Sequence, residues 1–285
     1  MVTSAPMNTI QRYAIRRTWG NETNSDPGTV IKTVFTVGKP ENARVQTRLE
    51  RESMVYRDII QEDFVDSYRN LTLKTVMCLK WASEFCPGAK FVMKADDDTF
   101  VNIYSLVRYL KRLPATNTRG LVTGYLYSGA KPVRNRTSQR GKPNKWYLSK
   151  QEYSRETFPN YPCGFAYVMS GDVVRPLYEV SPTVKYLFLE DVFLGLCLEK
   201  LGIEPVHHYG FHIINVAITR CITDGQLASH WHKRPLDMIH AWNRLNHMCK
   251  IEKFHARNQA YILIQSMGQL EDRGGSRLAN KPVIY

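Results

Sequence analysis

The sequence predicts an α/β protein with a largely parallel sheet, and two observations lead to this fold class. Segments rich in β-branched residues alternate with segments whose apolar residues recur at helical spacing, which is the order that successive β-α-β units produce. The chain has 285 residues, of which 43% are hydrophobic and 23% charged, so it is long enough to bury one large core or two small ones. This composition excludes collagen-like, coiled-coil and wholly disordered structures.

The first predicted elements form a strand, helix, strand, helix series. Residues 30–37 are rich in Val, Ile and Thr and end at a Gly-Lys-Pro turn, which predicts a strand. Apolar residues at helical spacing predict a helix over residues 44–56. A short strand is expected at residues 58–60, and a second helix over residues 71–85 ends at a Pro-Gly pair.

The next series places acidic residues at the end of a strand. The apolar residues 91–95 predict a buried strand that runs directly into Asp96-Asp97-Asp98. Asn102 is expected to cap a helix over residues 103–110, and residues 120–126 predict a further strand. Because parallel sheets bind ligands beyond the carboxyl ends of their strands, the three aspartates lie at the expected functional edge.

The second half of the chain begins with a basic, irregular stretch over residues 127–161. This stretch contains six Lys or Arg residues between positions 131 and 145, together with several Gly and Pro residues, and we expect loops and short strands there. Regular structure resumes as a strand at residues 165–169 and as helices over residues 171–180 and 191–201.

The formal charge of +13 comes from 39 Lys or Arg residues against 26 Asp or Glu residues. It favours anionic partners such as nucleic acid or phosphorylated ligands, and it is equally consistent with a basic surface that is merely solvated. No apolar run approaches the roughly 18 residues that span a bilayer. The first residues also lack the basic and apolar regions of a signal peptide.

Cysteines and glycosylation acceptors bear on the cellular compartment. Six cysteines without a Cys-x-x-Cys pair argue against a zinc site and leave disulfides open. Three Asn-x-Ser/Thr acceptors, at Asn21, Asn70 and Asn135, would be glycosylated only in the secretory pathway, where disulfides also persist. Asn70 has an alternative role as the N-cap of the helix that follows it.

Three groups of residues are candidates for chemistry. The acidic triplet offers hard oxygen ligands for Mg²⁺ or Mn²⁺ held with a substrate diphosphate, although such triplets also cap helices or lie in solvated turns. Glu190-Asp191 lies between apolar segments, where a carboxylate is costly unless it is paired or acts as a general base; Asp191 could instead cap the helix. If residues 227–232 form a strand, His230 and His232 share one face and could bind a metal or phosphate, whereas most single histidines are structural.

Five motifs in this order resemble the β-1,3-galactosyltransferase family. Each motif alone is weak, but their order and spacing over roughly residues 2–249 are highly specific. The motifs are RYAIRRTWG at residues 12–20, VFTVG at 34–38, DFVDSYRNLTLKT at 63–75, KADDDTFVN at 94–102 and LEDVFLG at 189–195.

The resemblance implies a single A-type glycosyltransferase domain over residues 1–249, with a Rossmann-like UDP-binding half to about residue 126 and an acceptor-binding half from residue 127. It implies an inverting enzyme that uses Mn²⁺, or Mg²⁺, to transfer galactose from UDP-galactose to position 3 of an acceptor sugar on a glycoprotein or glycolipid. N-acetylglucosamine is the alternative donor sugar, because the Asp-Asp-Asp form occurs in that branch of the family. Residues 250–285 form an extension with no assigned role.

The matched motifs also imply roles for individual residues. Asp191 is the expected base, and Asp98 and Asp96 are the expected metal ligands. The family's metal-binding histidine falls on Trp231 in this chain, so His230 or His232 must serve, and His230 is favoured. Donor-binding roles are implied for Arg16, Arg17, Trp19, Lys94, Asp96 and Asp97, and acceptor-binding roles for Trp146, Tyr147 and Glu190.

The resemblance further implies a type II Golgi membrane protein with a lumenal catalytic domain and an N-terminal anchor that is missing from this chain. Residues 2–6 resemble the end of the family's first catalytic strand, nucleic acid is not an expected partner, and Cys78 is the cysteine expected to remain free. Phe165 and Ala166 are bulkier than the small-residue run usual in the family. A catalytically silent relative that only binds UDP-sugar therefore remains an alternative.

Overall fold

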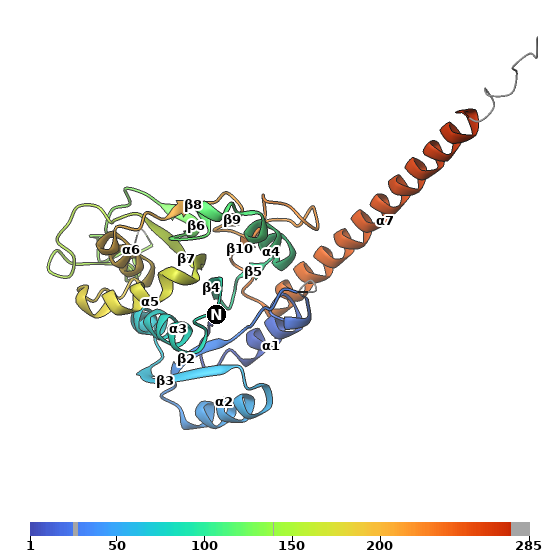
Figure 1. Cartoon of the computed structure of the whole chain (residues 1–285). Coiled ribbons are helices and arrows are strands. Elements are labelled where there is room, and N and C mark those ends of the chain that lie inside the picture. Colours follow the sequence, from blue (N-terminus) through green and yellow to red (C-terminus); the bar gives the residue numbers. More distant parts are fainter. Residues whose placement is uncertain (25–27, 139, 275–285) are drawn as a thin grey trace, which may run out of the picture.

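The computed structural model describes residues 1–24, 28–138 and 140–274, and its centre is a seven-stranded sheet (Figure 1). The strands are β1 (Val2–Thr3), β2 (Phe35–Lys39), β3 (Ile59–Val65), β4 (Phe91–Asp96), β6 (Val122–Tyr127), β7 (Tyr161–Ser170) and β8 (Val206–His207). They lie in the order β3-β2-β1-β4-β7-β6-β8. Neighbours are parallel except where β7 runs antiparallel to β4 and β6. The predicted α/β class with a largely parallel sheet is confirmed.

Helices cover both faces of this sheet. The α-helices are α1 (Thr9–Arg17), α2 (Ala43–Tyr56), α3 (Leu71–Phe85), α4 (Ile103–Arg112), α5 (Gly171–Val180), α6 (Glu190–Leu201) and α7 (Pro235–Gly274). Short 3-10 helices are η1 (Glu22–Asn24), η2 (Tyr68–Asn70), η3 (Ala115–Asn117) and η4 (Ser181–Thr183). The five helices predicted from apolar spacing correspond to α2–α6 within about two residues at each end.

The core has two layers, one on each face of the sheet. Helices α1 and α4 and the first turns of α7 contribute to one layer, and α3, α5 and α6 contribute to the other. Side chains of β7 alternate between them: Val168 lies in the first layer, and Tyr167 and Met169 lie in the second. This alternation is the period of two that a strand imposes, so β7 joins both layers.

The two-residue strand β1 occupies the middle of the sheet. Val2 pairs with Phe35 of β2 on one side and with Ala95 of β4 on the other. The amino group of Met1 donates a hydrogen bond to the Met93 carbonyl oxygen at 2.7 Å. Residues 2–3 therefore form the strand that the family resemblance implied, and Thr3 lies beside the carboxyl end of β4.

Several strand boundaries differ from the predictions. The strand expected at residues 30–37 begins only at Phe35, because β1 and β3 offer paired residues only from that position onward. The strand expected at residues 227–232 ends at Ser229, since Trp231 has a left-handed backbone with φ of 72°. Conversely, β3 and β7 are longer than the predicted segments.

A second sheet was not predicted, since each of its strands has only two residues. It contains β5 (Phe100–Val101), β9 (Phe211–His212) and β10 (Ala228–Ser229) in the order β5-β10-β9. Ser229 pairs with Phe100 just after the acidic triplet. This pairing brings the segment that follows β10 to the carboxyl end of β4.

Helix α7 begins against the body of the molecule and then leaves it (Figure 1). Its buried residues include Trp242 and Leu245, and a disulfide joins Cys249 to Cys221. The helix continues through position 249, where the catalytic domain was predicted to end, and residues 275–285 of the predicted extension lie outside the described residues. Among the described residues, no helix is both long and apolar enough for a membrane crossing. Cys78 is free, as expected, and so are Cys86, Cys163 and Cys197.

Candidate active site

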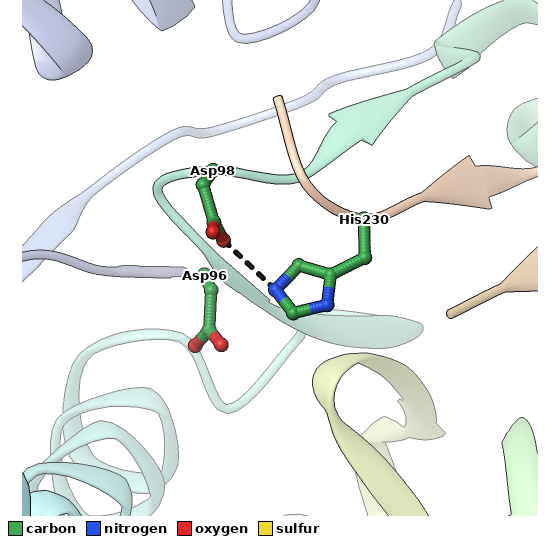
Figure 2. A group of neighbouring side chains, drawn as sticks. All are labelled: Asp96, Asp98 and His230. Carbon is green, nitrogen blue, oxygen red and sulfur yellow. Dashed lines mark ion pairs between the residues drawn. The ribbon is translucent and has the colours of Figure 1, made fainter. Parts of the chain in front are cut away.

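Three side chains from distant parts of the sequence converge at the carboxyl end of β4. Asp96 is the last residue of β4, Asp98 lies in the turn before β5, and His230 directly follows β10. One ligand atom from each residue lies within 4.8 Å of the other two, and each side chain remains partly exposed. Figure 2 shows the imidazole of His230 directed toward the two carboxylates. The predicted position of the acidic triplet at the functional edge therefore agrees with the structure.

The two carboxylates have different partners. His230 Nε2 lies 3.1 Å from Asp98 Oδ1. Burial acts to raise the pKa of Asp98, but the hydrogen bond and the charge of His230 outweigh it, and the pKa lies below its usual value. Asp96 accepts hydrogen bonds from Thr3 Oγ1 and Lys94 Nζ, both at 2.7 Å. Both carboxylates are thus held in place by neighbouring elements.

His230 and His232 diverge, contrary to the expectation that they share one face. His232 is buried, its Nε2 lies 3.0 Å from Ser229 Oγ, and its backbone N–H donates to the Asp98 carbonyl oxygen. The left-handed backbone of Trp231 breaks the strand period between the two histidines. His230, which was favoured over His232, is the histidine that reaches the acidic cluster.

The residues at this cluster fit a divalent cation. Two carboxylate oxygens and one imidazole nitrogen converge within ligand distance of a common centre and are accessible from outside. Mn²⁺ accepts this mixed oxygen and nitrogen set, whereas Mg²⁺ prefers oxygen ligands alone. The donor set is therefore compatible with a divalent metal ion.

Phe165 is the support for His230 that sequence reasoning missed. Its ring stacks on the imidazole with centroids 5.2 Å apart and an interplanar angle of 18°, and it is itself buried. The sequence marked Phe165 only as bulkier than the family pattern. The bulk has a function in the structure, because a ring that stacks on a ligand fixes its orientation.

Removing this ring is expected to weaken metal binding. Phe165→Ala should lower the affinity for Mn²⁺ by about tenfold, the lower end of the effect of losing a group that orients a metal ligand. A titration of Mn²⁺ followed by water proton relaxation measures this affinity, and Phe165→Tyr, which keeps the ring, serves as the matched control. Equal affinity in the alanine variant and the wild type would show that the stacking does not position His230.

A buried lysine connects the cluster to the second acidic motif. Lys94 Nζ lies 2.7 Å from Asp96 Oδ1 and 2.9 Å from Glu190 Oε1, and it also donates to the carbonyl oxygen of Gly164. Glu190 Oε2 accepts a hydrogen bond from Thr75 Oγ1 at 2.8 Å. Lys94 and Glu190 were expected to contact donor and acceptor, but both are buried and their polar atoms are occupied within the protein.

Asp191 forms the second part of the candidate site and lies in the first turn of α6. Its Oδ1 accepts from the Val192 N–H at 2.9 Å, and its Oδ2 accepts weakly from the Gly164 N–H at 3.4 Å. Burial raises the pKa of Asp191 to about 7, and the negative charge of Glu190 adds to this rise. A carboxylate with this pKa can hold or release a proton near neutral pH, which suits a general base.

Gly164 explains how the backbone comes so close to this acidic pair. A Cβ at this position would lie 2.5 Å from Glu190 Oε1. The glycine therefore permits a strand to pass directly against the two carboxylates. The family resemblance implies a run of small residues in this region, from which this sequence departs at Phe165, but Gly164, which the geometry requires, is present.

The remaining residues expected at the donor side are engaged elsewhere. Asp97 accepts from Ser4 Oγ at 2.6 Å and Asn8 Nδ2 at 2.9 Å; burial raises its pKa, although these hydrogen bonds oppose the rise. Arg16 forms ion pairs with Glu52 and Asp58, and Arg17 is exposed. Trp19 is buried and donates its indole N–H to the sulfur of Met238. The structure does not bring these residues into the Asp96–Asp98–His230 cluster.

Two of the residues expected to bind the acceptor, Trp146 and Tyr147, lie in the basic stretch over residues 127–161, which we call the basic loop. Trp146 is half exposed, and Tyr147 is partly buried beneath the guanidinium of Arg136 at 5.3 Å. Tyr68, which sequence reasoning missed, lies close to Trp146 and to the acidic residues. Burial raises the pKa of Tyr68 to about 12; the Trp146 indole acts against this rise, and the charge of Asp191 adds to it.

The glycosylation acceptors have different surroundings. Asn135 is exposed. Asn21 accepts hydrogen bonds from Thr23, and Asn70 donates to the Val65 carbonyl oxygen. Asn70 lies at the N-cap position of α3, but its side chain makes no capping hydrogen bond.

Comparison with known proteins identifies the family of this chain. Residues 10–209 match the galactosyltransferase family. The chain is 41% identical to human lactosylceramide 1,3-N-acetyl-beta-D-glucosaminyltransferase over 82% of its own length and 62% of that protein, and it thus spans less than two thirds of this relative. It is 39% identical to mouse beta-1,3-galactosyltransferase 1 over 82% of its length and 69% of that protein. Among solved structures, it is similar to galactosyltransferase LgtC with donor and acceptor sugar analogues, at 10% identity and a TM-score of 0.40 over 87% of this chain and 95% of that one. The chain therefore belongs to the galactosyltransferase family, within its β-1,3-glycosyltransferases.

Proposed function

We propose that this protein is an inverting β-1,3-glycosyltransferase that moves galactose from UDP-galactose to position 3 of an acceptor sugar on a glycoprotein or glycolipid. One observation carries the proposal: the Asp96–Asp98–His230 cluster and the Asp191 carboxylate are linked through Lys94 and Glu190. A transferase needs both features, one for the diphosphate of the donor and one for the hydroxyl of the acceptor.

Asp191 would act as the base. The acceptor oxygen attacks the anomeric carbon, the bond from that carbon to the diphosphate oxygen breaks, and Asp191 takes the proton of the acceptor hydroxyl. A single displacement inverts the configuration, and the protein forms no covalent bond to the sugar. The Gly164 and Val192 N–H groups orient the carboxylate.

On the donor side, Asp96, Asp98 and His230 would hold the metal ion. A divalent cation, when bound, neutralises the diphosphate and stabilises UDP as a leaving group. Thr3 and Lys94 keep Asp96 in position, and Phe165 does the same for His230. These contacts preorganise the three ligands before the donor binds.

N-acetylglucosamine is the second candidate for the donor sugar. The similarity to a relative named as an N-acetylglucosaminyltransferase supports this candidate, and the similarity to a relative named as a galactosyltransferase supports galactose. The two reactions use the same cluster and the same base. The two donor sugars differ in the substituent at position 2 and in the configuration at position 4.

Release of UDP from the purified protein tests both candidates. The assay compares UDP-galactose with UDP-N-acetylglucosamine in the presence of Mn²⁺, with a panel of acceptors that includes a lactoside, because one relative is named for lactosylceramide. We expect turnover with one donor that a chelator abolishes. Binding of UDP and Mn²⁺ without turnover on any acceptor would instead identify a silent relative.

The transfer rate is expected to depend on pH through Asp191. Because the pKa of this carboxyl is raised to about 7, its basic form is present above that pH and is lost below it. The value of kcat/KM should therefore fall about tenfold per pH unit below pH 6. A pH–rate profile measures this, with UDP binding over the same range as the control; a flat profile between pH 5 and 8 would contradict the role of Asp191.

We further propose that the protein acts in the lumen of the Golgi apparatus, held there by a type II anchor. The disulfide between Cys221 and Cys249 and the exposed acceptor Asn135 support a secretory compartment. Treatment of the protein, expressed in animal cells, with an N-glycan-specific glycosidase tests this. A shift in mobility is expected, and its loss in Asn135→Gln would assign the modified site.

A further inference from the structure

We propose that Lys145 makes this protein select acceptor glycans that carry an anionic group, a sulfate or a carboxylate, beside the reacting sugar. This inference rests on the proposed transferase function and adds a specificity to it. It follows from the position of Lys145 between two aromatic rings at the acceptor side of the Asp191 site.

The two rings locate Lys145 with respect to the reacting groups. Lys145 Nζ lies 5.0 Å from the centre of the Tyr68 ring and 4.8 Å from that of Trp146. The Tyr68 ring packs edge-on against Phe188, which lies three residues before Asp191 in the chain, with ring centroids 6.4 Å apart. Both rings are 41–50% exposed, so a sugar can reach their faces. Aromatic faces are common platforms for the apolar face of a sugar ring.

The charge of Lys145 is free for a ligand. Among the residues that the structure describes, no carboxylate forms an ion pair with it, and its ammonium contacts only the two rings in a cation–π arrangement. Other cations of the same loop serve the protein itself: Arg134 donates to four backbone carbonyl groups, and Arg136 stacks on Tyr147. Lys145 therefore differs from them in facing the acceptor side.

The balance of charge in this region favours an anion at that position. The stretch from Lys131 to Lys145 contains six Lys or Arg residues and no Asp or Glu. An anionic acceptor would be repelled by Asp191, whose charge no ion pair compensates among the described residues, and a cation at the entrance offsets this repulsion. A neutral acceptor needs no such compensation.

The ratio of two rates tests the proposal. The probes are a neutral methyl lactoside and the same lactoside with a 6′-sulfate, or with a 6′-carboxylate, each with the donor and Mn²⁺. The wild type should favour either anionic lactoside by about fivefold in kcat/KM, the upper range for an exposed ion pair. Lys145→Met should reduce this ratio to about one. Lys142→Met, a change at an exposed lysine of the same loop, should retain the ratio.

The ratio separates a specific role from a structural one. If Lys145 only held the rings in place, its loss would slow both reactions equally and leave the ratio unchanged, which would overturn the proposal. A different outcome is that Lys145→Met and Lys142→Met lose the preference for anionic lactosides to the same extent and also lose binding to vesicles of anionic lipid to the same extent. That result would assign the positive charge of the loop to contact with a membrane surface and would overturn the proposal. If no lactoside reacted, the proposed function would fail for these acceptors. In that case, NMR titration of the protein with the neutral and the sulfated lactoside still tests the preference for an anion. Equal affinities for the two lactosides would refute it.

Discussion

Replacing Asp191 by asparagine is expected to lower the rate of sugar transfer by about a thousandfold, within the range of 10²–10⁴ that a positioned general base supplies. The amide keeps the size of the carboxylate and can still accept the hydrogen bond that the Val192 N–H donates. It is far too weak a base to take up the proton of the acceptor hydroxyl. The rate of UDP release under saturating donor and acceptor measures the loss.

Binding of UDP and Mn²⁺ should remain close to that of the wild type in this variant, because Asp191 is not among the residues that converge on the metal cluster. Asp172→Asn is the matched control: Asp172 also lies in the first turn of a helix, α5, and accepts a hydrogen bond from Gly120 N–H, outside the candidate site. The control should transfer sugar at the normal rate. Retained turnover in Asp191→Asn would remove Asp191 from the role of base.

Replacing Asp98 by asparagine is expected to weaken Mn²⁺ binding by more than a hundredfold and to abolish metal-dependent binding of the donor. Asp98 would supply an anionic oxygen to the ion, and its carboxylate also lies against His230 at 3.1 Å. A neutral amide is a poorer ligand for a hard divalent cation and no longer attracts the imidazole in the same way. Calorimetric titration of UDP with and without Mn²⁺ measures the effect.

The neighbouring Asp97 provides a sharp comparison. Its carboxylate lies against Ser4 and Asn8, so Asp97→Asn should change Mn²⁺ affinity by less than a few fold. Both variants remove one negative charge from the same turn, and thermal unfolding confirms that each remains folded. Equal losses of Mn²⁺ affinity would indicate a general effect of charge and would contradict a direct metal contact by Asp98.

Much of the fold was predictable because long periodic segments carry their own signal. Helix α4 presents a stripe of apolar residues, α6 is apolar over most of its surface, and β4 is apolar except for Lys94 before the acidic triplet. The strands β5, β9 and β10 have only two residues each, too few to show a period. They form because tertiary contacts bring them together, and no local pattern records such contacts.

The candidate site was predictable only in part, for a similar reason. Asp96 and Asp98 follow a recognisable strand, but His230 is more than 130 positions away, and its choice over His232 depended on a family resemblance. The backbone of Trp231 separates the two histidines, and a tryptophan gives no warning of a positive φ. Phe165 and Tyr68 act through stacking and position, which composition does not reveal. Lys94 lies in the strand that was predicted to be buried, but the ion pairs that occupy it, with Asp96 and Glu190, were not foreseen.

The salt bridge between Lys94 and Glu190 also constrains how this protein can evolve. The two residues come from β4 and α6, and their side chains are 4% and 7% exposed. Loss of Lys94 leaves the carboxylate of Glu190 without a cation in a place that water does not reach, which typically costs about 3–5 kcal/mol and thus a large part of the stability of a domain. A lineage that replaces Lys94 first therefore passes through a poorly folded intermediate, whereas replacement of Glu190 first leaves Lys94 its ion pair with Asp96. Lys94 is accordingly expected to change only in descendants of this sequence that have already replaced Glu190.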